Sequence, residues 1–536
     1  MDEATLQHEH VWSTPLEARN ITRAEWKWVG VVSGIILALT LAPILWGYLI
    51  APDGWKFGGI IYNWQDSYSY LAKIWQGVRG EWVFTNPYSI ETGPPIYALY
   101  LNYLLLGHLA AWLQLDTTFV FHAARIAGGA ILLFTLYAFL ARIFSTVADR
   151  RFAFLICALG SGLGWLAVLF GKITPDLWQT ELSPFLSMHS NPHFPLAIAA
   201  FIWVVDLVCI EPTLQVRDTL WMWAGLAASA VTLAITQPYA LIVAAGVGVL
   251  WLVLGWMAGR RVEWRAAIRL AVVLAVAAPF ALYDVWIVVS DPDIALFNAQ
   301  DLAPTASVPE LLLGGGLLLL LAVIGGVIAL KRFAGHRDNR IELIAVLWGL
   351  VGVLMMYSPS LQQHRFAFAL FIPLGVLAVI AIQQVRRLER PAARLAIMAM
   401  LSLTNILFLI VLFATLNHGN TNLFVTDAEW KAMQFLRAAV PQHTVVLASP
   451  EMGLYIPAWS GQRVVYGHPI ETLHNTLRRT QVTAFYTGTL SDTAAFLAPV
   501  DVIFMGTRER ALGSPQIPAS YKQIYVDGDT AIYQRP

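Results

Sequence analysis

Long apolar runs separated by short polar turns fill most of the first 416 residues. A helix needs roughly 20 apolar residues to cross the hydrocarbon core of a bilayer, and about eleven runs are long enough. The run from Val29 is too long for the apolar part of a signal peptide, so we expect a retained first span. The predicted spans lie near residues 29–50, 124–145, 152–171, 193–211, 220–237, 238–258, 267–289, 309–331, 341–358, 366–386 and 393–416.

The pattern changes near Asn417, where long apolar runs stop. Short apolar runs at Thr444–Ala448, Arg463–Tyr466 and Val500–Met505 alternate with Pro, Gly and charged residues. A helical pattern precedes them, with Thr426 or Asp427 as its cap. Helix alternating with strand over this stretch predicts a small α/β domain. We therefore predict a polar segment 1–28, a transmembrane domain 29–416 with a first outer loop 51–123, and an α/β domain 417–536.

Composition supports a membrane protein, since 57% of residues are hydrophobic and only 13% are charged. Soluble domains carry roughly 25% charged residues. The 34 basic and 34 acidic residues balance, which argues against nucleic acid as a partner. Two cysteines, Cys157 and Cys209, both lie in apolar runs and suit neither a disulfide framework nor a zinc site.

Basic residues are unevenly distributed between alternate turns. The positive-inside rule places the Lys- and Arg-rich turns, with the amino terminus, in the cytoplasm. The domain 417–536 is then extracytoplasmic, on a multi-pass protein of the plasma (inner) membrane. Residues Ile96–Leu115 are also apolar, but a crossing there would invert every later turn. We expect this segment to lie along the outer leaflet. The basic turns contain Arg19, Arg23, Lys27, Arg142, Arg150, Arg151, Arg217, Arg260, Arg261, Arg265, Lys331, Arg332, Arg337, Arg340, Arg386, Arg387, Arg390 and Arg394.

Acidic residues and histidines gather in the outer loops. Asp66 follows the first span among aromatic residues and is our candidate for a catalytic base, although a helix cap is the alternative. Glu91 shares this loop and is a candidate for a second catalytic carboxylate, with a solvated turn residue as the alternative. The next outer loop holds Asp176 and Glu181, and the sequence does not choose between them.

The same loop holds His189 and His193, whose spacing would suit a metal site on one helix. Pro192 between them breaks such a helix, which disfavours a metal site. Hydrogen bonding of His193 to a ligand is the better functional interpretation, and a plain interfacial loop is the favoured alternative. In the stretch 290–310, four acids (Asp291, Asp293, Asp301 and Glu310) would suit a divalent cation, but an outer side poor in Lys and Arg explains them equally. The sequence implies no particular cofactor.

Arginines facing outward are rare, which draws attention to Arg125 and Arg365 at the outer ends of two spans. A guanidinium fork matches a phosphate, whereas snorkelling to lipid headgroups is the alternative. We expect Lys73 and Arg79 to be headgroup anchors. The polar–aromatic stretch 461–468, with Glu471, is interpreted as a strand and turn of an ordinary small fold.

Several features occur in a recognisable order along the first 150 residues. Asp66 leads into an amphipathic helix, Tyr68–Arg79; Pro94-Pro95 then starts a second surface helix that ends near Gly107, and Arg125 opens the next span. This order resembles the GT-C glycosyltransferases, which take sugars from polyprenyl phosphates. Two features depart from the pattern of this superfamily. Many members have two adjacent acids in the first loop, whereas Asp66 lies between Gln65 and Ser67. Many also have His before Pro-Pro, where this chain has Glu91-Thr92-Gly93.

The resemblance implies a GT-C-like polytopic helical fold and an inverting sugar transfer to an unidentified acceptor at the outer membrane face. It implies Asp66 as base, a second acid in the next outer loop and Arg125 at the donor phosphate. The remaining candidate substrate-binding residues are Arg365, His193, His189 and Tyr70. A flippase or transporter of a lipid-linked substrate is the alternative, and it would need ionisable residues within spans, chiefly Asp206, Asp284 and Glu342. A non-catalytic scaffold would leave the acidic first loop unexplained.

Overall fold

The computed structural model describes residues 21–91, 96, 97, 99–210, 216–259, 262–335, 340–417 and 419–536. Its helices confirm an integral, multi-pass membrane protein. Seven helical stretches of the described chain are long and apolar enough to cross a bilayer, and a pair bent by 44°, α17 (Pro391–Leu401) with α18 (Leu403–Thr415), makes an eighth. The seven are α1 (Arg23–Leu49), α4 (Thr117–Ile143), Val147–Phe170, Thr219–Thr236, α11 (Pro238–Gly259), α12 (Trp264–Ser290) and α14 (Val308–Gly335). Val147–Phe170 comprises α5 (Val147–Leu159), α6 (Gly164–Ala167) and η2 (Val168–Phe170), and Thr219–Thr236 belongs to α10 (Val216–Thr236).

Three of the predicted spans fall on shorter helices, α9 (His193–Cys209), α15 (Leu343–Met355) and α16 (Phe371–Ile382). Every residue of α16 is buried. Its twelve residues extend about 18 Å, less than the roughly 30 Å of a hydrocarbon core. Apolar runs predicted these three helices, but burial against other helices also produces such runs, so the sequence alone overstates the number of full-length spans.

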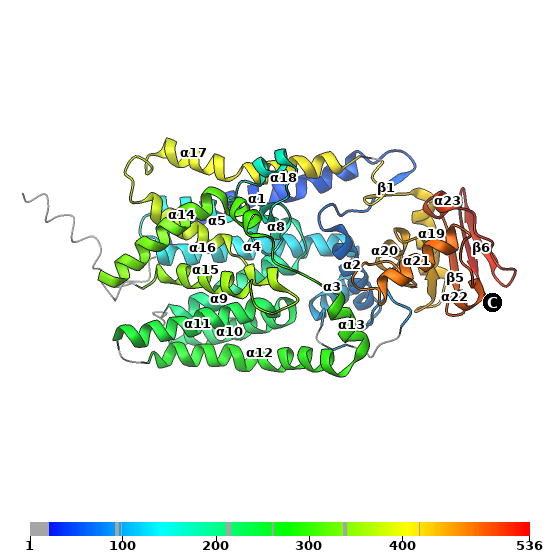
Figure 1. Ribbon diagram of the computed structural model, residues 1–536, viewed down its shortest axis with the longest axis horizontal. Helices are drawn as coiled ribbons and strands as arrows, with labels where there is room; N and C mark the ends of the chain where they lie inside the picture. The colour runs from blue at the N-terminus through cyan, green and yellow to red at the C-terminus, as the bar shows by residue number, and fades with distance from the viewer. Residues whose placement is uncertain are drawn as a thin grey trace, which may run out of the picture.

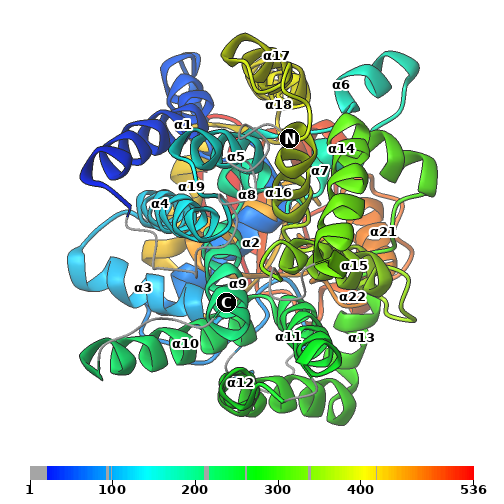
Figure 2. The same ribbon diagram turned by 90° about the vertical axis from the view of Figure 1, so that its left-hand side faces the viewer.

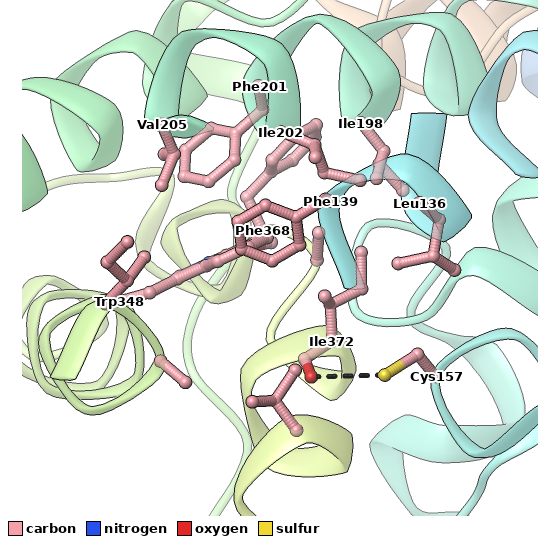
Figure 3. Packing of buried hydrophobic residues seen from close by; sticks show 14 of the residues in the cluster. Leu136, Phe139, Cys157, Ile198, Phe201, Ile202, Val205, Trp348, Phe368 and Ile372 are labelled. Carbon is pink, nitrogen blue, oxygen red and sulfur yellow. Dashed lines mark hydrogen bonds between the residues drawn. The ribbon is translucent and has the colours of Figure 1, made fainter. Parts of the chain in front are cut away.

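The spanning helices form one bundle at one end of the molecule, and the sheet lies at the other end (Figure 1). Figure 2 looks along the bundle and shows α9 and α16 surrounded by other helices. In the core between them, the ring of Phe201 lies 4.6 Å from that of Trp348 and 5.7 Å from that of Phe368 (Figure 3). The Cys157 thiol donates to the Ile372 carbonyl over 3.4 Å.

Two helices of the first outer loop, α2 (Trp64–Val78) and α3 (Leu101–Leu113), pack closely on each other. A Cβ atom at Gly77 or Gly107 would lie 2.1 Å from a backbone oxygen of the other helix, so the backbones touch only because both residues are glycine. The thirteen residues of α3 extend about 20 Å, and Trp112 is 80% exposed. This helix alone is shorter than the roughly 30 Å of a hydrocarbon core. Pro94-Pro95 lies outside the described residues.

The carboxyl-terminal region has the predicted α/β architecture. Its five-stranded sheet has the order β4-β3-β5-β7-β6; β3 is parallel to β4 and β5, and β7 is antiparallel to β5 and β6. Thr426 caps the first helix and forms a reciprocal capping box with Glu429. The strands are β3 (Val445–Leu447), β4 (Arg463–Val464), β5 (Val502–Met505), β6 (Lys522–Asp527) and β7 (Thr530–Gln534), and the helices are α19 (Asp427–Ala439), α20 (Met452–Ser460), α21 (Asn475–Tyr486), α22 (Thr493–Leu497) and α23 (Thr507–Leu512).

The first outer loop is attached to this region in two places. Strand β1 (Trp55–Phe57) pairs antiparallel with β2 (Phe424–Thr426). Helix α2 packs on α20, where the ring of Tyr68 lies 4.8 Å from that of Tyr455. In Figure 1, α2 and α3 lie between the bundle and the sheet. Residues from both ends of the chain therefore meet around α2.

Candidate functional site

A cavity of about 720 Å³ has walls from the membrane helices, the first outer loop and the carboxyl-terminal region. Its apolar lining comes mainly from α10, α11 and α12, and includes Ile235, Leu241, Phe280, Val285 and Val288. Its charged and histidine lining comes mainly from loops and helix ends, and includes Asp66, Glu181, Asp301, Arg365, His468 and Glu471. One space thus offers apolar walls beside ionisable groups.

Asp66 lies in the first turn of α2, whose cap residue is Asn63. It is therefore not the cap that we considered as its alternative role. Its Oδ2 accepts a hydrogen bond from Asn63 Nδ2 over 3.0 Å, and its Oδ1 lies 3.3 Å from His468 Nε2. Burial raises the pKa of Asp66, but His468 and Asn63 outweigh this effect and hold it below its usual value. The side chain is 39% exposed and lines the cavity, so an ionised carboxylate faces that space.

Arg365 lies in the short helix η3 (Gln363–Ala367), on the loop between α15 and α16. Its Nη2 donates to Asp301 Oδ2 over 2.8 Å, just after α13 (Pro292–Gln300). Burial lowers the pKa of Arg365, but Asp301 and Glu181 outweigh this effect and raise it above its usual value, so the guanidinium stays charged. Asp301 therefore binds one edge of the planar Arg365 guanidinium, and the Arg365 side chain lines the cavity.

Three other predicted residues line the same cavity. The carboxylate of Glu181 makes no hydrogen bond or ion pair with the part of the chain that the structure describes, although the residue is only 7% exposed. Tyr70 stacks on Tyr103 with ring centroids 4.3 Å apart, and the Tyr103 hydroxyl lies 2.6 Å from Nδ1 of His193. The structure therefore brings together Asp66, Glu181, Tyr70, His193 and Arg365.

Lys73 is not a headgroup anchor, as its position on an amphipathic helix had suggested. Its side chain is 0% exposed, and its Nζ lies 2.8 Å from Oε1 of Glu471. Ser69 hydrogen-bonds to both groups. Burial raises the pKa of Glu471, but Lys73 outweighs it and holds that pKa below its usual value. Arg79 also has protein partners, with its Nε 3.0 Å from Glu81 Oε1 and its Nη1 donating to the Gly461 carbonyl.

Asp176 and Glu91 do not line this cavity. Asp176 lies in α7 (Pro175–Trp178) and is 1% exposed; its Oδ2 accepts from the amides of Gly162 and Gly164 over 3.0 and 3.1 Å. It therefore shapes the turn before α6. Glu91 pairs with Arg478 over 2.7 Å and joins the first outer loop to α21. The structure gives both carboxylates structural partners instead of a place beside Asp66.

Arg125 and His189 also lie outside the cavity, contrary to our expectation. Arg125 is 1% exposed and donates to the carbonyl of Met188, while its Nε lies 3.3 Å from Nδ1 of His122. It therefore neither snorkels to headgroups nor faces the cavity. His189 ends α8 (Pro184–His189), and its Nδ1 donates to the Phe185 carbonyl over 2.9 Å. As predicted, the helix breaks around Pro192. Of His189 and His193, only His193 lines the cavity.

The sequence did not single out His468, Glu471 or Asp301 as site residues. His468 and Glu471 belong to the dense polar stretch that we interpreted as an ordinary strand and turn. Asp301 belongs to the acidic stretch 290–310. There, Asp291 caps α13, Asp301 pairs with Arg365 and Glu310 accepts a hydrogen bond from Ser307. Among the described residues, no group of three or more His, Cys, Asp or Glu could hold a metal ion.

Comparisons with known proteins place the chain by its fold. No family model and no curated protein matches the sequence. The solved structure of ArnT from Cupriavidus metallidurans bound to undecaprenyl phosphate is similar, with a TM-score of 0.54, 12% identity, and coverage of 95% of this chain and 98% of that one. The oligosaccharyltransferase of Archaeoglobus fulgidus in the apo form has a TM-score of 0.53 and 13% identity, over 89% of this chain and 69% of that one. Its complex with an inhibitory peptide and a dolichol-phosphate has a TM-score of 0.52 and 12% identity, over 90% and 70%. This chain therefore shares its fold with ArnT and with this oligosaccharyltransferase.

Proposed function

We propose that the protein is a membrane glycosyltransferase that moves a sugar from a polyprenyl-phosphate donor to an acceptor. The observation that carries this proposal is one cavity in which an ionised carboxylate, Asp66, and a charged guanidinium, Arg365, share apolar walls from three membrane helices. Such a space suits a lipid tail, a phosphate and a base together. Two proteins of similar fold were solved with undecaprenyl phosphate and dolichol-phosphate bound, which supports this class of donor.

In the proposed reaction, Asp66 accepts the proton of an acceptor hydroxyl as its oxygen bonds to the anomeric carbon of the sugar. The bond between that carbon and the phosphate oxygen breaks, and its electron pair leaves with the polyprenyl phosphate. Arg365 stabilises the negative charge that develops on the leaving phosphate. Attack opposite to the leaving group inverts the anomeric carbon. Tyr70, His193 and Glu181 line the same space and would contact the sugar or the acceptor.

We further propose that this cavity opens to the outer face of the inner membrane, with the amino terminus in the cytoplasm. The bias of basic residues toward alternate turns supports this orientation. The pairing of β1 with β2 supports it too, because it holds the first outer loop and the region 417–536 on the same side. On this topology, residues 29–416 are the transmembrane domain and residues 417–536 are the extracytoplasmic domain.

Two of the three ionisable residues that a flippase would use have ion-pair partners within the bundle. Asp206 pairs with Arg142 over 3.1 Å, and Glu342 pairs with Arg332 over 2.6 Å. Asp284 lies on α12 and lines the cavity. These pairs join neighbouring helices and do not form a polar path through the bundle. Together with the glycosyltransferase fold, they favour the enzyme over the transporter.

The test uses the full chain in lipid nanodiscs with a panel of undecaprenyl-phosphate monosaccharides, and it measures the release of undecaprenyl phosphate. Asp66→Asn keeps the shape of the side chain but removes the base, so we expect release to fall at least about 100-fold. Asp53→Asn is the control, because Asp53 is an exposed acid of the same loop that does not line the cavity. Release by Asp66→Asn at the wild-type rate would refute the role of Asp66 and, with it, the proposed function. Movement of intact lipid between leaflets of proteoliposomes, without release, would support the flippase.

A further inference from the structure

The segment 467–472 holds the imidazole of His468 in a fixed orientation. Its Nδ1 lies 3.2 Å from the amide of Ile470 and 3.1 Å from the amide of Glu471, and both N–H groups donate to it. The amides of His468 and Gly467 donate in turn to the hydroxyl of Thr472. The residue is 2% exposed. The ring cannot turn without losing two hydrogen bonds to buried backbone groups.

These bonds determine which nitrogen carries the proton. A nitrogen that accepts two N–H groups is unprotonated, so the hydrogen of the neutral ring is on Nε2. Nε2 lies 3.3 Å from Oδ1 of Asp66, within ion-pair distance, and it makes no hydrogen bond with any described residue. His468 therefore presents a donor to Asp66 and has no free lone pair with which to accept a proton from it.

We propose that His468, supplied by the carboxyl-terminal region, is a positioning residue that orients Asp66 and keeps it ionised without taking up its proton. This inference rests on the proposed function, because it assigns a partner to the proposed base. Asn63 donates a hydrogen bond to one carboxylate oxygen, and Nε2 of His468 lies 3.3 Å from the other. Each oxygen retains a lone pair for the proton of the acceptor. The base is therefore completed by a residue about 400 positions away in the sequence, and the membrane helices alone do not form the whole site.

Other titratable groups surround Asp66 and remain in place when His468 is changed. The positive charge of Arg365 also lowers the pKa of Asp66, and Lys73 is paired with Glu471. The groups that face Asp66 are Tyr62 of the first outer loop, Tyr70 and Lys73 of α2, Tyr103 of α3, Glu181 of the second outer loop, His193 of α9, Arg365 of η3, and Glu471. A substitution at His468 therefore removes one N–H donor near Asp66 and leaves these other groups unchanged.

Two substitutions distinguish the role of the Nε2–H donor of His468 from the role of Nδ1 in holding the segment 467–472. His468→Asn places an amide oxygen near the position of Nδ1, which preserves an acceptor for the two backbone amides but is too short to reach Asp66. His468→Gln is long enough to place an N–H near the position of Nε2. His474→Asn is the matched control, because His474 is exposed, lies in the same region and does not line the cavity.

The first measurement does not depend on turnover. The full chain in nanodiscs is treated with a water-soluble carbodiimide and an amine across a pH series, and labelling of Asp66 is measured by mass spectrometry. A carboxyl group reacts in its protonated form, so the midpoint of labelling reports the titration of Asp66. We expect His468→Asn to move this midpoint up by about one pH unit, because it removes the N–H group that faces the carboxylate, and His468→Gln to restore part of it. An unchanged midpoint in His468→Asn would overturn the inference.

The second measurement is the release of undecaprenyl phosphate. We expect His468→Asn to lower kcat about tenfold, to move the acid limb of the pH profile upward and to leave the KM for the lipid within about twofold. A residue that only stabilises the turn would lower the melting temperature without moving the acid limb. If Asp66→Asn is inactive while His468→Asn keeps the wild-type kcat and acid limb, the inference fails but the proposed function stands. If Asp66→Asn is fully active, the proposed function fails.

Discussion

Replacement of Lys73 by methionine is the most informative test of how the two ends of the chain are joined. The side chain of Lys73 is 0% exposed and that of Glu471 is 7% exposed, with 2.8 Å between Nζ and Oε1. At an effective dielectric constant near 20, the attraction at this distance is about 6 kcal/mol, and desolvation of both ions offsets much of it. Removing one partner leaves an uncompensated buried charge, which costs about 3–5 kcal/mol.

The ammonium also lies near three aromatic rings. Its Nζ is 4.1 Å from the ring centroid of Tyr100, 4.9 Å from that of Tyr70 and 5.3 Å from that of Phe84. These cation–π contacts are lost in any neutral variant. The double variant Lys73→Met/Glu471→Gln removes both charges, so we expect it to recover most of the loss and to remain about 1–2 kcal/mol less stable than the wild type.

The assay is the free energy of unfolding of each variant, from denaturant titration of the purified protein followed by tryptophan fluorescence. Lys56→Met is the control, because Lys56 and Asp427 join the same two parts of the chain over 3.7 Å but are 47% and 43% exposed. An exposed pair contributes less than about 1 kcal/mol. The reasoning is refuted if Lys73→Met costs no more than Lys56→Met, or if the double variant is less stable than Lys73→Met.

Two further predictions concern the donor phosphate and the first outer loop. Arg365→Lys keeps the charge beside Asp301 but loses the planar fork, so we expect undecaprenyl phosphate to bind about tenfold more weakly in a titration with labelled lipid; equal affinity would exclude Arg365 from the phosphate site. Burial raises the pKa of Glu91, but Ser89 and Arg478 outweigh it and lower that pKa. A carboxylate with a lowered pKa stabilises the fold above its unfolded pKa, near 4.3, and loses this contribution as the pH falls through its folded value. The unfolding free energies of wild type and Glu91→Gln should therefore converge below about pH 4, whereas a constant difference down to pH 2 would contradict this ion pair.

The fold was largely predictable because membrane helices leave a strong local signal in the sequence. The apolar runs located the spanning helices and the shorter α9, α15 and α16, and short runs located β3, β4 and β5. Hydropathy cannot distinguish a helix that faces lipid from one that is buried by other helices. For this reason α16, which is buried along its whole length, was predicted as a full span.

The site was predictable where chemistry is encoded locally. Arg365 was recognisable because arginines at the outer ends of spans are few, and Asp66 because it follows the first span among aromatic residues. Arg125 met the same criterion but is satisfied by backbone carbonyls, and carbonyls leave no signal in a sequence. Lys73 looked like a headgroup anchor because its partner, Glu471, is 398 positions away. Pairings of this kind come from tertiary structure alone.

The most direct test of the central claim is an experimental structure of the full chain with undecaprenyl phosphate bound. We predict that the phosphate lies within about 3 Å of the Arg365 guanidinium, on the same side of the cavity as the Asp66 carboxylate. The isoprenoid tail should contact α10, α11 and α12. A phosphate bound outside this cavity, or one separated from Asp66 by protein, would contradict the claim that this space is where the sugar is transferred.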